Sequence, residues 1–155
     1  MLEIKNLNVN INSIKILEDL NIKVSKFSSI IGRNGAGKTT LMRTIVGILK
    51  IKKGSILFGP KDLTNIQPHF ISMEGIGYMP EDRRLVPELN VKENILVPMW
   101  ATNSRYQNIE IEKVLSFIPE LKNLLHRGAF QLSGGQQKLV ALARAMIVGK
   151  KLLLL

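Results

Sequence analysis

A glycine-rich segment of the chain has the residue types and spacing of a phosphate-binding loop. Glycine, lysine and threonine fill the four defined positions of the pattern G-x-x-x-x-G-K-[ST], at Gly32, Gly37, Lys38 and Thr39. Glycines let backbone N–H groups converge on phosphate oxygens, the lysine adds a compact positive charge, and the threonine hydroxyl is a ligand for Mg²⁺. The segment therefore predicts ATP or GTP binding. The residues predicted to hold the nucleotide are Gly32, Arg33, Asn34, Gly35, Ala36, Gly37, Lys38, Thr39 and Thr40.

A second glycine motif, LSGGQQ at Leu132–Gln137, stands directly before a long segment of helical periodicity. Ser133 is a good N-cap residue. A serine, backbone N–H groups and a helix N-terminus can together hold an anion. Taken alone, however, the motif is more simply a serine cap followed by two glycines.

Strand and helix patterns surround the phosphate loop. The apolar run Phe27–Ile31 predicts a strand before it, and the helical spacing of apolar residues in Lys38–Leu49 predicts a helix behind it. Alternating apolar and polar residues predict an antiparallel flank formed by Leu2–Ile11 and Leu20–Val24. Further short strands are predicted at Ser55–Phe58 and Ile76–Met79.

The later part of the chain is dominated by helical patterns. Helices are predicted at Val91–Val97, Ile109–Ile118 and Leu121–Leu125, and a long one from Ser133 to Gly149. The run Leu152–Leu155 predicts a fully buried, parallel strand. We expect one domain over residues 1–155: a phosphate-loop core with a β subdomain at 1–85, a helical subdomain at 86–132, and the last helix with the start of a strand at 133–155.

Composition restricts the classes of function. The 155 residues fit one domain, and the absence of cysteine is in keeping with a reducing compartment such as the cytoplasm. No uncharged apolar run approaches the roughly 18 residues of a membrane span. The formal charge of +10 comes from scattered lysines without a dense basic tract, so nucleic-acid binding is not favoured.

The order of phosphate loop, helical stretch and LSGGQQ resembles that of ATP-binding cassette (ABC) proteins. The resemblance implies an α/β fold: a P-loop NTPase (RecA-like) core with an antiparallel β flank and a helical subdomain. It also implies ATP with Mg²⁺, and a head-to-tail dimer with a second cassette. Ser133, Gly134, Gly135 and Gln136 would then act in trans on the partner's nucleotide. Transmembrane permease subunits would hold the protein at the inner face of the membrane.

A narrower resemblance concerns the segment after Met79. Its run Pro-Glu-x-Arg-Arg, followed by Pro-x-Leu-x-Val-x-Glu-Asn, is similar to the cassettes of branched-chain amino-acid importers. Most cassettes carry glutamine where this chain has Glu81. The resemblance implies that Glu81 reaches the magnesium through water, so Lys38 and Glu81 are the expected catalytic residues and Thr39 and Glu81 the expected metal ligands. Arg83 and Arg84 would contact a partner or be solvated.

The chain departs from the family pattern at three places. Ile11 stands where an aromatic residue usually stacks on adenine, so we expect an apolar contact there. The connection from Val24 to Gly32 is about two residues short and lacks the usual Gly-Glu turn, which predicts a local distortion. In the family, Asp-Glu follows the strand predicted at Leu152–Leu155, and a switch histidine comes later. None of these residues is present, so we expect a fragment that binds nucleotide weakly and hydrolyses it hardly at all.

Three functions are compatible with these patterns. The first is the ATP-binding subunit of an importer of branched-chain or related amino acids. The second is a soluble ABC ATPase acting on nucleic acid or the ribosome, although such proteins usually carry tandem cassettes, zinc cysteines or a long coiled coil. The third is a nucleotide-binding remnant that does not hydrolyse ATP.

Overall fold

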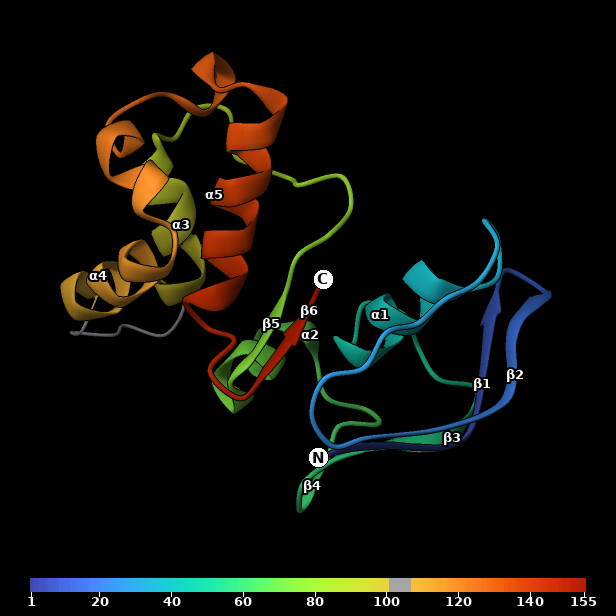
Figure 1. Cartoon of the computed structure of the whole chain (residues 1–155). Helices are drawn as coiled ribbons and strands as arrows, with labels where there is room; N and C mark the ends of the chain where they lie inside the picture. The colour runs from blue at the N-terminus through green and yellow to red at the C-terminus, as the bar shows by residue number, and fades with distance from the viewer. Residues whose placement is uncertain (101–106) are drawn as a thin grey trace. The chain divides into compact units, whose positions relative to one another are not determined.

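The chain forms two compact units in a computed structural model, Met1–Ile71 and Ser72–Leu155, and the structure describes residues 1–100 and 107–155. The helical stretch expected over 86–132 therefore contains six residues, 101–106, that lie outside the described residues. Figure 1 colours the first unit from blue to green and the second from green to red.

The first unit is built on a four-stranded antiparallel sheet with the strand order β2-β1-β3-β4. Its strands are β1 (Leu2–Ile11), β2 (Ile14–Val24), β3 (Lys53–Phe58) and β4 (Lys61–Asp62). The alternation predicted for the first two strands is confirmed, because the β1 side chains of Leu2, Ile4, Leu7 and Val9 are at most 4% exposed. β1 pairs with β2 on one side and with β3 on the other, so it is the central strand of the antiparallel flank.

Two helices complete the first unit, α1 (Lys38–Ile45) and the short α2 (Pro68–Ile71). Leu41, Thr44 and Ile45 form the buried side of α1. The helix is shorter than the predicted span to Leu49. It ends early because Gly47 adopts a left-handed backbone (φ 74°) and donates its N–H to the Thr44 carbonyl.

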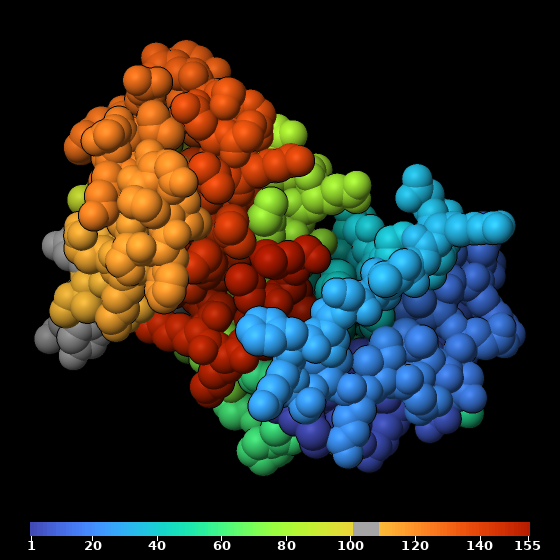
Figure 2. All heavy atoms as spheres, viewed as in Figure 1, coloured from blue at the N-terminus to red at the C-terminus, as the bar shows by residue number. Residues whose placement is uncertain are grey.

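The predicted strand at Phe27–Ile31 is wrong. No residue of this segment is assigned to a strand, and Phe27 and Ile31 are almost fully exposed, at 103% and 94%. Figure 2 shows the light-blue segment at the surface. A strand needs a neighbour for its ladder hydrogen bonds, and apolar composition alone does not supply one. The disagreement falls on the shortened connection after Val24, where we expected a local distortion.

The second unit contains a two-stranded parallel sheet formed by β5 (Ile76–Tyr78) and β6 (Leu152–Leu154). The register pairs Ile76 with Leu152 and Tyr78 with Leu154, which confirms the predicted parallel strand near the end of the chain. The expectation of full burial is wrong: Leu154 is 7% exposed, but Leu155 is 69% exposed. In the described sheet β6 has β5 as its one neighbour, so its faces are incompletely covered.

Helices form most of the second unit. They are α3 (Val91–Trp100), α4 (Gln107–Phe117) and α5 (Gly134–Met146), with the 3₁₀ turns η1 (Ser72–Glu74), η2 (Pro119–Leu124) and η3 (Ala129–Gln131). One apolar core joins α3, α4, η2 and α5. Its fully buried members include Val91, Ile95, Leu121 and Val140. The helices predicted around Val91–Val97 and Ile109–Ile118 and after Ser133 are confirmed, whereas the helix predicted at Leu121–Leu125 is wrong, because this segment begins inside the 3₁₀ turn η2.

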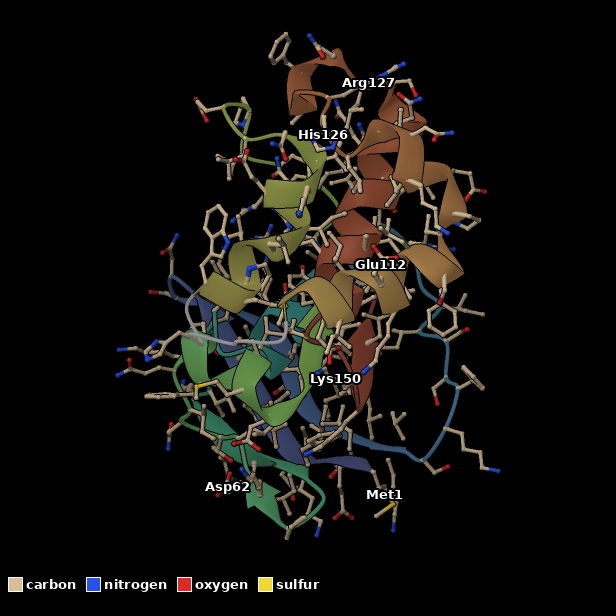
Figure 3. The ribbon with its side chains drawn as sticks, turned by 90° about the vertical axis from the view of Figure 1, so that its left-hand side faces the viewer. Met1, Asp62, Glu112, His126, Arg127 and Lys150 are labelled. Atoms are coloured by element: carbon tan, nitrogen blue, oxygen red, sulfur yellow. The ribbon has the colours of Figure 1, made fainter. Side chains whose placement is uncertain are left out.

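An ion-pair cluster ties α4 to the turn that follows α5. The Glu110 carboxylate, with 13% of its side chain exposed, lies 3.0 Å from Lys150 Nζ and 3.3 Å from Lys113 Nζ. Lys150 is labelled in Figure 3, beside α4. Burial raises the pKa of Glu110, but the bonds from the two lysines outweigh it and hold the pKa below its ordinary value. The stabilisation is therefore present above the ordinary pKa of glutamate and is lost as the pH falls through the folded-state value.

Asn94 is a buried polar residue that fixes the loop before α3. Its side chain is 0% exposed. The Oδ1 atom accepts from the Val86 N–H at 2.8 Å, and Nδ2 donates to the carbonyls of Val86, Leu89 and Asn90 at 3.0 to 3.1 Å. The Val86 N–H has its partner in Asn94, and the three carbonyls gain a second bond besides those from the backbone N–H groups of Leu89, Ala129 and Asn94.

We expect Asn94→Ala to lower the free energy of unfolding by about 2 kcal/mol, because it removes four hydrogen bonds and leaves the Val86 N–H without its Asn94 partner. Urea unfolding followed by the fluorescence of Trp100, the single tryptophan, measures the loss in the unit concerned. The matched control is Asn123→Ala on the exposed side of η2, for which we expect a change within about 0.5 kcal/mol. Equal effects of the two substitutions would contradict the role assigned to Asn94.

Candidate functional site

The phosphate-loop residues lie in an exposed turn that leads into α1. Gly35 and Gly37 both have left-handed backbones, with φ of 85° and 86°. Gly37 is the N-cap of α1, and a Cβ atom at this position would lie 2.7 Å from Leu17 Cδ2 on β2. The backbone angle therefore favours glycine at position 37, and any larger residue would also have to displace the Leu17 side chain.

Lys38 folds back over this turn. Its Nζ donates to the carbonyl of Gly32 at 2.7 Å and to that of Arg33 at 2.9 Å, while Ala36 N–H closes the turn on Arg33 at 3.2 Å. The loop thus curves around the ammonium group. No acidic residue lies in the first turn of α1, where Lys38, Thr39 and Thr40 stand. This arrangement fits a polyphosphate and its Mg²⁺: the ammonium group and the helix N-terminus suit the phosphates, and the exposed hydroxyl of Thr39 suits the metal ion.

Ile11 ends β1 in the hairpin that leads into β2. The side chain is paired in register with Ile14 and is 38% exposed, and Ile14 is 68% exposed. The hairpin therefore offers an apolar surface in the same unit as the phosphate loop. This surface is suited to an apolar contact with a flat ring.

The second glycine motif caps α5. Ser133 Oγ accepts from the Gln136 N–H at 3.3 Å, and Gln136 Oε1 accepts from the Ser133 N–H at 3.0 Å. This reciprocal capping box confirms Ser133 as the N-cap. Gly134 and Gly135 are exposed in the first turn, and the Arg83 guanidinium lies beside Gly134, with Nη1 3.6 Å from the place of a Cβ atom. A Cβ at Gly135 would meet nothing within 4 Å, so open space lies next to this end of the helix.

Glu81 lies in a turn just after β5. The Met79 N–H donates to the Leu154 carbonyl at 2.9 Å, and the Arg83 N–H donates to the Pro80 carbonyl at 3.0 Å. Glu81 is therefore held one residue inside a turn that starts at the end of the parallel sheet, and its side chain is exposed. An exposed carboxylate is suited to reach a metal directly or through water.

The two arginines after this turn differ in their surroundings. Arg83 is half-buried, and its Nη1 donates to Gln137 Oε1 on α5 at 3.1 Å. Arg84 is exposed and forms a 2.7 Å ion pair with Asp82. The sequence left open whether the two arginines contact a partner or are solvated. Arg83 contacts Gln137 of this chain, on α5, the helix that begins within LSGGQQ, the signature motif. Arg84 stays at the solvent, where such a pair contributes little to stability.

Sequence reasoning missed Arg144. Its guanidinium, on α5, donates through Nη1 to the Arg84 carbonyl at 2.7 Å and through Nη2 to the Arg83 carbonyl. Burial lowers the pKa of Arg144 from its ordinary value, partly opposed by Asp82, and the group stays charged at any ordinary pH. No motif singles out this arginine, because its acceptors are backbone atoms some sixty residues away.

Two features are absent from the described residues. Within residues 1–100 and 107–155, no group of three or more histidine, cysteine, aspartate or glutamate side chains is arranged to hold a metal ion. In the same residues, each helix is too short or too polar to cross a membrane. The two glycine motifs and the Glu81 turn are thus the features on which an assignment depends.

Comparison with known proteins assigns the class of protein. The family model described as ABC transporter matches residues 17–155. The chain belongs to the ABC transporter family, and it has the P-loop NTPase fold of that family's ATP-binding cassettes. A crystal structure of a nucleotide-free ATP-binding cassette from an ABC transporter matches with a TM-score of 0.82 and 32% identity, over 99% of this chain and 67% of that one.

Curated relatives extend the similarity to particular transporters. The chain is 35% identical over 144 residues to BraG of Pseudomonas aeruginosa, a high-affinity branched-chain amino acid transport ATP-binding protein. It is 36% identical over 164 residues to WtpC of Methanocaldococcus jannaschii, a molybdate/tungstate import ATP-binding protein. These alignments cover 92% and 100% of the chain, which spans 62% of the length of BraG and 52% of that of WtpC.

Proposed function

We propose that the protein is the ATP-binding subunit of an ABC importer for branched-chain or related amino acids. The observation that carries the proposal is the phosphate loop, in which two left-handed glycines and the ammonium group of Lys38 meet at the start of α1. That geometry suits the phosphates of a nucleotide, and family membership makes ATP the nucleotide.

The residues of the first unit take up one nucleotide in this proposal. Lys38 exchanges its bonds to the carbonyls of Gly32 and Arg33 for bonds to the terminal phosphates. Thr39 supplies a hydroxyl to Mg²⁺, and Ile11 supplies an apolar surface to the base. The remaining loop residues, from Gly32 to Gly37 together with Thr40, surround the phosphates with backbone N–H groups and the Thr40 side chain.

The residues of the second unit act on a nucleotide held by another copy. Ser133, Gly134 and Gly135 present a capped helix start with open space beside it, which suits the phosphates of an ATP bound to a second cassette. Gln136 keeps Ser133 in place through the capping box. Glu81 takes the metal-facing position, and Mg²⁺ when bound neutralises the charge of the transferring phosphate.

Partners and location follow from this proposal. A second cassette completes each nucleotide site, and transmembrane permease subunits hold the pair at the cytoplasmic face of the membrane. ATP binding closes the cassette pair and hydrolysis by the full-length protein reopens it, so the permease alternates its access. The support for an amino-acid substrate is the run from Pro80 to Ile95 together with the similarity to BraG.

Uptake of a labelled substrate tests the importer and its substrate together. In cells that lack the gene, we expect the full-length protein to restore uptake of labelled leucine at least tenfold, and Lys38→Ala to restore none. Lys50→Ala, which changes an exposed lysine outside the loop, is the matched control and should restore uptake fully. Restored molybdate uptake with unchanged leucine uptake would overturn the amino-acid substrate, and no change in either would overturn the importer.

A further inference from the structure

The turn that carries Glu81 is attached to α5 at two places. Arg144 donates to the carbonyls of Arg83 and Arg84, and the Arg83 guanidinium in turn donates to Gln137. Gln137 also donates to the Leu132 carbonyl at 3.3 Å, at the start of the signature motif. A continuous set of hydrogen bonds therefore runs from the Glu81 turn to the residues before Ser133.

The backbone of this turn requires such an attachment. Arg83 and Arg84 have left-handed conformations, with φ of 59° and 46°. A left-handed backbone conformation is unfavourable in free energy for two consecutive residues with long side chains. It persists only where contacts with the surrounding structure hold it in place. The bidentate guanidinium of Arg144 meets the two carbonyls that this conformation turns toward α5. One planar group thus stabilises both unfavourable residues.

The far side of the loop is fixed independently. Asn94 binds the backbone of Val86 and Leu89, a few residues after the arginines. The segment from Pro80 to Asn90 is therefore held at its start by β5, at its end by Asn94 and in between by Arg144. Without Arg144, the stretch from Glu81 to Leu85 would lose both of its backbone attachments to α5 and would keep the side-chain bond from Arg83 to Gln137.

We propose that Arg144 is a positioning residue that fixes Glu81 relative to the signature residues Ser133, Gly134 and Gly135. The inference rests on the proposed function for its effect on ATP turnover, but the attachment itself is a property of the second unit. Because Glu81 and the signature motif are held on one helix, the metal-facing carboxylate moves together with the signature residues. Arg144 itself touches neither nucleotide nor metal.

Hydrogen exchange and ATPase kinetics of the full-length protein test this role. In Arg144→Met, which keeps the apolar stem and removes the guanidinium, we expect exchange of the amides of residues 81–85 to rise at least tenfold. We expect kcat for ATP to fall at least tenfold while the Kd for ATP changes less than threefold, because the Lys38 loop is untouched. Arg144→Lys keeps the charge without the fork and should recover part of both losses.

Two further variants separate a specific role from general damage. Lys138→Met removes an exposed cation from the same helix and should leave exchange and kcat unchanged. Arg84→Asn places a residue that tolerates left-handed backbone at position 84, so combined with Arg144→Met it should recover part of the exchange protection. If Arg144→Met fails to fold, the exchange and kcat of Arg144→Lys decide the question.

The results that would overturn the inference are distinct from those that would overturn the function. Unchanged exchange at residues 81–85, or unchanged kcat, in both Arg144 variants contradicts the positioning role. A rise in Kd as large as the fall in kcat also contradicts it, because it indicates a structural loss that reaches the phosphate loop. Absence of ATP binding by the unsubstituted protein overturns the proposed function, and the exchange measurement still tests the attachment.

Discussion

Lys38→Ala is expected to weaken ATP binding by about 30- to 150-fold, the loss that follows from removing charge-assisted hydrogen bonds of about 2–3 kcal/mol. The ammonium group lies inside the phosphate loop, bonded to the Gly32 and Arg33 carbonyls, and no acidic side chain in the first turn of α1 competes for it. Titration of the full-length protein with a fluorescent ATP analogue measures the change. Lys50→Ala should bind as tightly as the unsubstituted protein, and an equal loss in both variants would contradict the assignment.

Lys38→Ala, combined with a second variant at Gly135, tests whether the phosphate loop of one chain and the signature motif of the other act on the same ATP. Gly135→Asp puts a carboxylate into the open space beside the start of α5, where it repels phosphate. Homodimers of Lys38→Ala, and homodimers of Gly135→Asp, should occlude no ATP between their two chains. A mixed dimer of the two variants keeps one unaltered loop facing one unaltered signature, so we expect about one occluded ATP per mixed dimer. Occlusion that is absent from the mixed dimer would refute action in trans.

Local chemistry made most of the candidate site predictable from the sequence. Specific residue types mark three local features: the turn at Gly37, the start of a helix at Lys38 and the helix cap at Ser133. Glycine is typical of left-handed turns and serine of N-caps, so these features could be predicted. The strand at Leu152–Leu154 and its parallel direction follow from an apolar run after a helix. In each case the signal lies within about ten residues of the feature that it predicts.

The features that the sequence did not predict depend on contacts with residues far away in the chain, which a local sequence pattern does not reveal. Phe27–Ile31 has the composition of a strand, but strand formation also depends on a neighbour in register, and here the segment is unpaired. Arg144 binds backbone carbonyls, which every residue has, so the residue types at positions 83 and 84 gave no sign of the contact. The left-handed backbone of these two arginines runs against their intrinsic preference.

Close backbone packing in the second unit gives the largest expected effect on stability. Gly77, in the middle of β5, lies against the last turn of α5 and the turn that follows it. A Cβ atom at this position would lie 2.0 Å from the Ala145 carbonyl oxygen and 2.9 Å from Gly149 Cα. The Ala145 oxygen also accepts the Gly149 N–H at 2.9 Å, so it is part of the turn that leads into β6. Backbone atoms on both sides leave no flexible side chain to move aside.

Gly77→Ala is therefore expected to lower the free energy of unfolding by about 3 kcal/mol or more, because relief of the clash must separate β5 from α5. With an m-value of about 2 kcal/mol/M, the urea midpoint should fall by at least about 1.5 M. The matched control is Gly135→Ala, also a glycine of the second unit but one whose Cβ would meet nothing within 4 Å. Since Gly135 lies within α5, alanine there should be neutral or stabilise by up to about 1 kcal/mol. A loss below about 1 kcal/mol for Gly77→Ala would show that α5 and β5 can separate at little cost. The proposed fixed placement of Glu81 would then be untenable, because the turn that carries it begins at the end of β5 and is held by α5.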